Sequence, residues 1–197
     1  MNEKLEILYK ECIQELQSIG INVIDNESIG TIEIKIQKRK TKRYGCCKQE
    51  EPVEETKYIE IKNRRKYIRY YRYKKHLIEI SSWVMQLDNS IIKNTILHEI
   101  IHCFPYCNNH GKQFKKYAKY INEKLGYNIS RLGNKEEDYK KSNIEYKEEK
   151  IYKYKIQCKK CGQIAYRQRL NKNFTRKYKC GICGGKFNVD FFKKVDT

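Results

Sequence analysis

Two pairs of cysteines near the C-terminus constrain the fold of this chain more than any other feature. Cys158 and Cys161 form one Cys-x-x-Cys pair, Cys180 and Cys183 form a second, and 18 residues separate the pairs. This spacing is typical of a four-cysteine zinc site. Residues 151–197, which carry both pairs, are too few to bury much of a hydrophobic core. We therefore predict a small β zinc-ribbon domain that is held together by one structural zinc ion.

The number and spacing of the cysteines, together with the pattern of hydrophobicity, predict a protein that resides in a reducing compartment. Nine cysteines are an odd number, and two Cys-x-x-Cys pairs in a strand-rich segment favour metal binding over disulfides or redox catalysis. The chain has no run of roughly 18 apolar residues that would span a membrane. The charged amphipathic pattern of residues 3–19 is unlike a signal peptide. We expect a protein that is neither secreted nor bound to a membrane.

Hydrophobic periodicity predicts an α+β domain in the first part of the chain. Apolar residues at helical spacing predict a helix over 3–19, and the alternation of Ile with polar residues predicts a half-buried strand over 32–36. Residues 38–65 are polar and are expected to form a long loop or a hairpin. Further strands are expected over 66–73 and 76–82. These segments together predict a small mixed sheet.

Two more helices are expected before a charged linker. Apolar positions over 91–103 follow the possible caps Asp88 and Ser90, and a second helical face over 114–125 is closed by Gly126. The highly charged segment that follows has no convincing buried face. The expected organisation is a first domain over 1–133, a charged linker over 134–150 and the basic zinc ribbon over 151–197.

The first of these two helices carries His98, Glu99 and His102 in the pattern His-Glu-x-x-His. Residues four apart lie on one face of a helix, so both imidazoles can bind one zinc ion with Glu99 beside them. A catalytic zinc needs a third protein ligand and an open fourth position. His110 is the best candidate, because a reversal of the chain after the helix can return it to the metal.

Several other residues compete for roles at this site. Cys107 is a rival third ligand, because thiolates also bind zinc, whereas Cys103 is expected to be a small buried hydrophobe. His76 lies in a strand pattern and is expected to be structural or exposed. Tyr106 is a candidate to stabilise an oxyanion, although a chain with 17 tyrosines makes any single choice weak.

The three histidines and Glu99 predict metal-assisted hydrolysis. A catalytic zinc lowers the pKa of its bound water toward about 7 and polarises a carbonyl group. Glu99 is then the catalytic general base that takes the proton and returns it to the leaving amine. The expected cofactors are therefore two zinc ions, one catalytic and one structural.

The distribution of charge predicts a polyanionic partner. The formal net charge is +19, and residues 151–197 hold 13 basic and 2 acidic residues. Less than a quarter of the chain thus carries more than half of its net charge. An A/T-rich coding sequence would explain part of the lysine excess but not this asymmetry. A second basic run at 38–43 is expected to be a solvated loop.

Within the zinc ribbon, cations alternate with aromatic residues, including Phe174 and Tyr178. This combination is typical of proteins that follow a phosphate backbone while bases stack on aromatic rings. The alternative is a solvated basic face with two tyrosines, Tyr166 and Tyr178, packed around the zinc. The candidate nucleic-acid-binding residues are Tyr166, Arg167, Arg169, Lys172, Arg176 and Lys177.

These features together resemble the SprT-like metalloprotease family, whose best-known eukaryotic member is Spartan. The matching pieces are HEIIH at 98–102, HGKQF at 110–114 and the C-terminal CKKC and CGICGG motifs. The segment from Arg43 to Cys46 and the later HLIEIS are also similar to the strands that precede the family's active-site helix. The loop over 50–55 and the tyrosine-rich run over 66–73 do not match the family.

The resemblance implies a zincin-like domain in which His98, His102 and His110 bind zinc and Glu99 is the base. It also implies an endopeptidase that cleaves proteins at DNA, including proteins crosslinked to DNA, with the basic ribbon bound to single-stranded or junction DNA. The expected location is then the cytoplasm or the nucleoid. A nucleic-acid-binding zinc protein without significant peptidase activity is the alternative. In a third hypothesis, the ribbon binds other proteins and the protease acts away from DNA.

Overall fold

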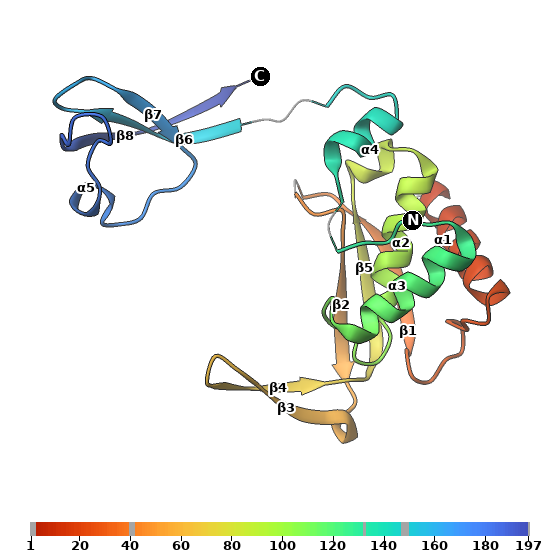
Figure 1. Cartoon of the computed structure of the whole chain (residues 1–197). Coiled ribbons are helices and arrows are strands. Elements are labelled where there is room, and N and C mark those ends of the chain that lie inside the picture. Colours follow the sequence, from red (N-terminus) through yellow and green to blue (C-terminus); the bar gives the residue numbers. More distant parts are fainter. Residues whose placement is uncertain (1–2, 40–41, 132, 147–149, 197) are drawn as a thin grey trace. The chain divides into compact units, whose positions relative to one another are not determined.

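The chain divides into two compact units, residues 1–145 and 146–197, in this computed structural model (Figure 1). The structure describes residues 3–39, 42–131, 133–146 and 150–196. Among these residues, no helix is both long enough and apolar enough to cross a membrane. The architecture is α+β, with small sheets in both units.

The first unit begins with a helix and then builds its strands before its remaining helices. Two short 3-10 turns, Glu54–Thr56 and Val84–Gln86, lie between the elements. In chain order the elements are α1 (Glu3–Ser18), β1 (Thr31–Gln37), β2 (Gly45–Pro52), β3 (Lys57–Lys62), β4 (Arg65–Tyr70), β5 (Tyr73–Ser81), α2 (Asn89–Ile101), α3 (Lys112–Leu125) and α4 (Lys135–Lys141).

A three-stranded mixed sheet with the order β1-β5-β2 forms the floor of this unit. The central strand, β5, pairs in parallel with β1 and antiparallel with β2. Ile34 on β1 and Ile78 and Ile80 on β5 are buried, which agrees with the alternation of apolar residues in the sequence. The edge strand β2 lies next to α2.

Helices cover one face of the sheet and form the hydrophobic core with it (Figure 1). α2 is buried on most sides, and its Ile92, Ile96 and Ile100 are inaccessible to solvent. The helix begins after Asp88, whose carboxylate accepts a hydrogen bond from the backbone N–H of Ser90 at 2.9 Å. This is the helix that the sequence predicts, although it begins and ends two residues earlier than expected, and Asp88 rather than Ser90 is its cap.

The segment over 38–65 differs from the expected loop, because it contains the edge strand β2 and the first strand of a hairpin. The hairpin, β3 paired with β4, extends away from the three-stranded sheet (Figure 1). β2 reads GCCKQEEP, and its side chains are half-buried or exposed. β2 pairs with β5 through backbone hydrogen bonds at the edge of the sheet. This pairing does not require alternating apolar side chains, so the sequence of β2 shows no such alternation.

Much of the expected linker over 134–150 also folds onto the first unit. α4 lies in this segment, and Tyr139 stacks on Trp83 with ring centroids 6.0 Å apart. Lys135 lies 4.0 Å from the centroid of the same indole, and Tyr44 donates a hydrogen bond to Asp138. The helix is therefore held by a few specific contacts rather than by a continuous apolar face. The linker residues 147–149 lie outside the described residues.

The second unit is a three-stranded antiparallel sheet with the order β7-β6-β8. Its elements are β6 (Lys150–Cys158), β7 (Ile164–Arg167), a short helix α5 (Phe174–Lys177) and β8 (Phe187–Asp196). The buried residues described here are few and include Ile156, Cys158 and Cys180. This small core agrees with the expectation that the four cysteines stabilise the unit.

The burial of His76 on β5 predicts a loss of stability in acid. The side chain is inaccessible to solvent, and burial lowers its pKa from about 6.5 to about 4. The unfolded chain therefore binds a proton at His76 between these pH values, whereas the folded protein does not. We expect His76 to lower the free energy of unfolding by about 3 kcal/mol between pH 7 and pH 4.

Urea unfolding followed by the fluorescence of the single tryptophan, Trp83, measures this dependence. His76→Leu keeps the volume roughly constant and removes the titration, so its stability should fall less over the same pH range. The metal-binding histidines titrate in both proteins and cancel in the comparison. Equal pH dependence in the two proteins would contradict the prediction.

Candidate active site

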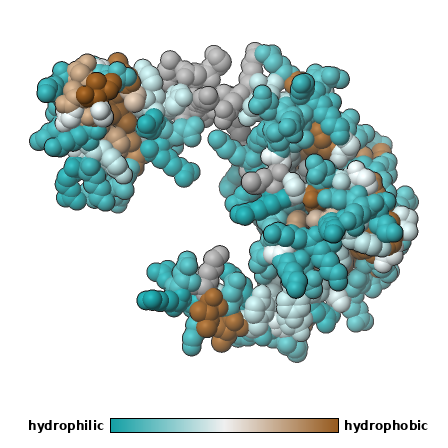
Figure 2. Space-filling view, viewed as in Figure 1, coloured by the Kyte–Doolittle hydropathy of each residue, from teal (hydrophilic) through white to brown (hydrophobic). Residues whose placement is uncertain are grey.

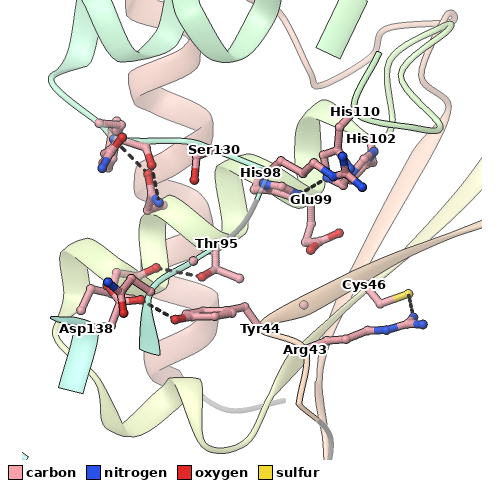
Figure 3. A pocket seen from close by; sticks show the side chains of 18 of the residues that line it. Arg43, Tyr44, Cys46, Thr95, His98, Glu99, His102, His110, Ser130 and Asp138 are labelled. Carbon is pink, nitrogen blue, oxygen red and sulfur yellow. Dashed lines mark hydrogen bonds between the residues drawn. The ribbon is translucent and has the colours of Figure 1, made fainter. Parts of the chain in front are cut away.

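The structure brings His98, His102 and His110 together at one point. His98 lies in the last turn of α2, His102 caps the C-terminus of this helix four residues later, and His110 lies in the loop before α3 (Figure 3). The Nε2 atom of His110 lies 2.9 Å from that of His98 and 3.3 Å from that of His102. The three side chains form a group that can hold a metal ion.

Contacts behind the imidazoles orient the nitrogens that converge. The Nδ1 atom of His102 donates a hydrogen bond to the backbone carbonyl of Cys107 at 2.5 Å. A carbonyl can only accept, so Nδ1 carries the proton and Nε2 offers a lone pair. Phe114 packs against all three imidazoles, with ring centroids 4.7 to 4.8 Å apart. The site is thus fixed by its surroundings as well as by the helix.

Burial keeps these histidines neutral. It lowers the pKa of His98 to about 3, with a further contribution from His102 and His110, while a backbone hydrogen bond to Ser130 acts in the opposite direction. Burial also lowers the pKa of His102 and His110, and Arg131 adds to the effect at His110. Only a neutral imidazole can bind a metal. Three neutral nitrogen donors that converge on one point fit zinc.

Glu99 lies beside the three histidines and is almost completely buried, with 5% of its surface exposed. Burial raises the pKa of this carboxyl to about 7, and it outweighs a hydrogen bond from the backbone of Cys47 and the charge of Arg43. A carboxyl group with this pKa can both accept and release a proton near neutral pH.

Gly45 at the start of β2 allows Glu99 to approach the sheet. A Cβ atom at this position would lie 2.8 Å from both Cγ and Oε1 of Glu99. Any other residue would therefore displace the carboxylate or the strand. The absence of a side chain at Gly45 therefore lets β2 and α2 pack closely at the carboxylate of Glu99.

A cavity of about 1080 Å³ opens over the histidines and Glu99. One wall consists of residues 42–47, and another consists of residues in the segments 126–131 and 133–138. The walls meet where the hydroxyl of Tyr44 donates a hydrogen bond of 2.5 Å to Asp138 (Figure 3). The cavity is large enough to admit a segment of polypeptide.

The other residues considered from the sequence lie elsewhere or act indirectly. Cys107 is buried and is not a member of the described metal-binding group; its carbonyl accepts the hydrogen bond from His102. Cys103 is buried, as expected, with its sulfur 3.7 Å from that of Cys47. Tyr106 is not among the described residues that line the cavity, and its ring stacks on Tyr71. The structure therefore does not support Tyr106 as an oxyanion donor.

Part of the basic run over 38–43 has a role that the sequence did not reveal. Lys42 and Arg43 line the cavity instead of forming only a solvated loop, and Arg43 acts on the pKa of Glu99. Residues 40–41 lie outside the described residues. The sequence carried no local signal for this, because a polar segment does not indicate that it faces a site.

The four paired cysteines converge in the second unit. Their sulfur atoms lie within 4.8 Å of one another, and each Cys-x-x-Cys pair ends in a glycine with positive φ, Gly162 or Gly184. Backbone hydrogen bonds from Cys161 and Lys160 lower the pKa of Cys158 to about 6, and those from Cys183 and Ile182 lower the pKa of Cys180. The group fits zinc in a closed tetrahedral site.

The basic residues singled out in this unit are exposed around β7 and α5. Tyr166 is 37% exposed and also contacts Tyr152, whereas Tyr178 is 52% exposed and contacts Phe174. Neither ring is therefore fully packed around the cysteines. The exposed set includes Tyr166, Arg167, Arg169, Lys172, Arg176 and Lys177.

Comparison with protein families identifies a matching family. The model of the SprT-like family matches residues 10–133, which include all three histidines and Glu99. The chain belongs to the SprT-like family. Membership of this family suggests a metalloprotease-like function. No curated protein matches the chain. The family match ends before the second unit.

The two ligand groups predict a zinc content that falls in separate steps. The purified protein should contain two zinc ions per chain, because both groups offer complete sets of zinc-binding atoms. His110→Ala should lose the ion bound to the histidines, and Cys180→Ala should lose the other. Elemental analysis after gel filtration measures both. His76→Ala removes a histidine outside both groups and should leave the zinc content unchanged. A single ion in the unaltered protein would contradict the prediction.

Proposed function

We propose that this SprT-like protein is a zinc-dependent endopeptidase with a zincin-like catalytic domain. The observation that carries the proposal is the convergence of three neutral imidazoles beside a buried carboxyl group in an open cavity. A zinc ion held by His98, His102 and His110 would act as a Lewis acid toward water and the scissile carbonyl. The three histidines line the open cavity, so a zinc ion held by them would be accessible to water and substrate, as a catalytic rather than a structural zinc site requires.

Glu99 is the proposed general base and acid. Its burial favours the neutral form, while the backbone N–H of Cys47 and the charge of Arg43 favour the carboxylate. This balance places the pKa where the group can take a proton from water and then deliver it to the leaving amine. The close contact with Gly45 limits the movement of the carboxylate between the two steps.

The edge strand β2 supports an extended polypeptide as the substrate. β2 has β5 on one side, and its first residues, Gly45 to Cys47, line the cavity. A substrate segment that adds to the other edge would run past Glu99 and the histidines. Such binding requires an unfolded or flexible segment, so we propose that the enzyme cleaves exposed segments of proteins.

We further propose that the second unit is a zinc ribbon that binds DNA, so that the protease acts on proteins at DNA, including proteins crosslinked to it. The net charge of +11 over residues 151–197 and the exposure of the cations around β7 and α5 support this role. Exposed Tyr166 and Tyr178 offer rings on which bases of single-stranded DNA can stack.

Replacement of the base tests the catalytic proposal. Glu99→Gln keeps the shape of the side chain but cannot accept the proton, so cleavage of a basic, unfolded protein should fall at least 100-fold. The zinc content should stay unchanged, which separates loss of the base from loss of the metal. Cleavage is measured by electrophoresis with and without single-stranded DNA, and DNA is expected to stimulate it.

Three outcomes would change the proposal. If cleavage is absent from the unaltered protein while DNA is bound, the chain is a nucleic-acid-binding zinc protein without significant peptidase activity. If Glu99→Gln cleaves normally, the proposed mechanism is wrong. Cleavage that is lost in the variant but indifferent to DNA would leave a protease whose ribbon binds another partner.

The contact between Gly45 and Glu99 gives a second test of the catalytic geometry. Gly45→Ala places a methyl group 2.8 Å from the carboxylate and should lower kcat at least tenfold without loss of zinc. Gly20→Ala is the control, because its Cβ atom would meet nothing within 4 Å; its φ of +81° adds a backbone strain that Gly45→Ala does not carry. Equal activity of the two variants would show that the close approach at Gly45 is unimportant for catalysis.

A further inference from the structure

The hairpin formed by β3 and β4, residues 57–70, stands apart from the rest of the first unit (Figure 1). Its two strands pair in register from Lys57 with Tyr70 to Lys62 with Arg65. Asn63 and Arg64 connect them with φ values of 50° and 60°, as in the tight turn that suits the twist of a two-stranded hairpin. Six residues per strand give the hairpin a length of about 20 Å.

The hairpin carries a concentrated positive charge. It contains six basic residues and one acidic residue, a net charge of +5, whereas the net charge of residues 1–150 is +8. Its acidic residue, Glu60, is paired with Arg69 at 3.0 Å. In the described part of the chain, Arg64, Arg65 and Lys66 near the tip have no acidic partner, and all three are exposed. A cluster of this kind attracts a polyanion.

One face of the hairpin is also apolar. Ile59 and Ile68 are directly opposite each other, and Ile61 lies two residues further along the same face. They are 62%, 59% and 70% exposed, respectively. Figure 2 shows this hydrophobic patch on the hairpin, next to hydrophilic groups. Three exposed isoleucines on a thin hairpin are costly in water unless a partner covers them.

We propose that this hairpin is a DNA-binding element of the catalytic unit and that its ligand is single-stranded DNA. A single strand presents phosphates together with uncovered, apolar base faces, which match the cations and the isoleucine face. A duplex presents the same phosphates but hides the faces of its bases, so it would leave the isoleucines exposed. An acidic protein would also match the cations, but no described feature of the hairpin favours an acidic protein over DNA.

The base of the hairpin contacts the loop that carries the third histidine. Tyr106, between His102 and His110, stacks on Tyr71 with centroids 4.7 Å apart and planes inclined by 14°, and it also contacts Tyr58 on β3. A strand bound to the hairpin would therefore lie within the same unit as the cavity and next to its metal-binding loop. This arrangement would bring proteins attached to DNA close to the active site even if the second unit did not bind DNA.

The inference rests on the proposed action at DNA only for the identity of the polyanion. It assigns DNA binding to a segment outside the zinc ribbon, so binding and cleavage can be tested separately. Because the ribbon is itself expected to bind DNA, the test uses the full chain with the ribbon cations Arg167, Arg169 and Lys172 changed to Gln. This background exposes the contribution of the hairpin.

The variant Arg64→Gln/Arg65→Gln/Lys66→Gln tests the charge at the tip. In fluorescence anisotropy with a labelled oligothymidine, it should bind at least tenfold more weakly than the background protein. Loss of three phosphate contacts should also reduce the slope of log K against log salt by about 2. The matched control Lys115→Gln/Lys116→Gln/Lys124→Gln removes three exposed cations from α3 and should leave the affinity within about twofold.

A second variant tests the apolar face and the preference for a single strand. Ile59→Thr/Ile61→Thr/Ile68→Thr keeps β-branched residues in the strands, so the hairpin should form. It should weaken binding of oligothymidine at least fivefold but leave binding of a duplex of equal length unchanged. Equal losses with both DNAs would overturn the assignment to single strands.

If the tip variant binds DNA as the α3 control does, the hairpin is not a DNA-binding element, and the proposal is wrong. Circular dichroism and the zinc content show that each variant is folded. Cleavage of an unfolded protein in the absence of DNA should be the same in the tip variant and the background protein. Absence of that cleavage in both would contradict the proposed peptidase function while the DNA-binding result still stands by itself.

Discussion

The convergence of three imidazoles on one point is the constraint on which the rest of the first unit depends. Nitrogen lone pairs that face one another at 2.9 and 3.3 Å repel unless a proton or a cation lies between them. The protein holds them there with the bond from His102 to the carbonyl of Cys107 and with the ring of Phe114, which contacts all three. Burial then keeps the imidazoles neutral and ready for a metal.

The buried helix α2 connects the position of the histidines to the packing of the whole unit. Its apolar residues are enclosed by α1, α3 and the sheet, so the helix cannot rotate without exposing them. Glu99 is on this helix and is pressed against Gly45 of the edge strand, which couples the position of the carboxylate to the sheet. The packing that stabilises the core therefore also fixes the geometry of the candidate site. The hairpin and the second unit, in contrast, have little hydrophobic core of their own.

Much of this arrangement is predictable from local patterns. The helical spacing of apolar residues predicts α1, α2 and α3, and the pattern of His98, Glu99 and His102 predicts a metal group with His110 as its third member. The segment over 38–65 is the main disagreement. β2 is polar because it is an edge strand, and it is a strand only because β5 offers it hydrogen bonds. The local sequence of β2 does not show that β5 will pair with it. The residues of β2 that line the cavity could therefore not be predicted.

The atoms that can bind metal are predictable from local sequence, because ligand type and spacing along a helix or in a Cys-x-x-Cys pair are local properties. The sequence also shows where positive charge and aromatic residues are concentrated. Long-range packing, in contrast, places Arg43 and Gly45 next to Glu99, Tyr106 against the base of the hairpin and His76 in the interior. These contacts join residues far apart in the chain, and they depend on how a sheet and helices pack, which the spacing of residues does not encode.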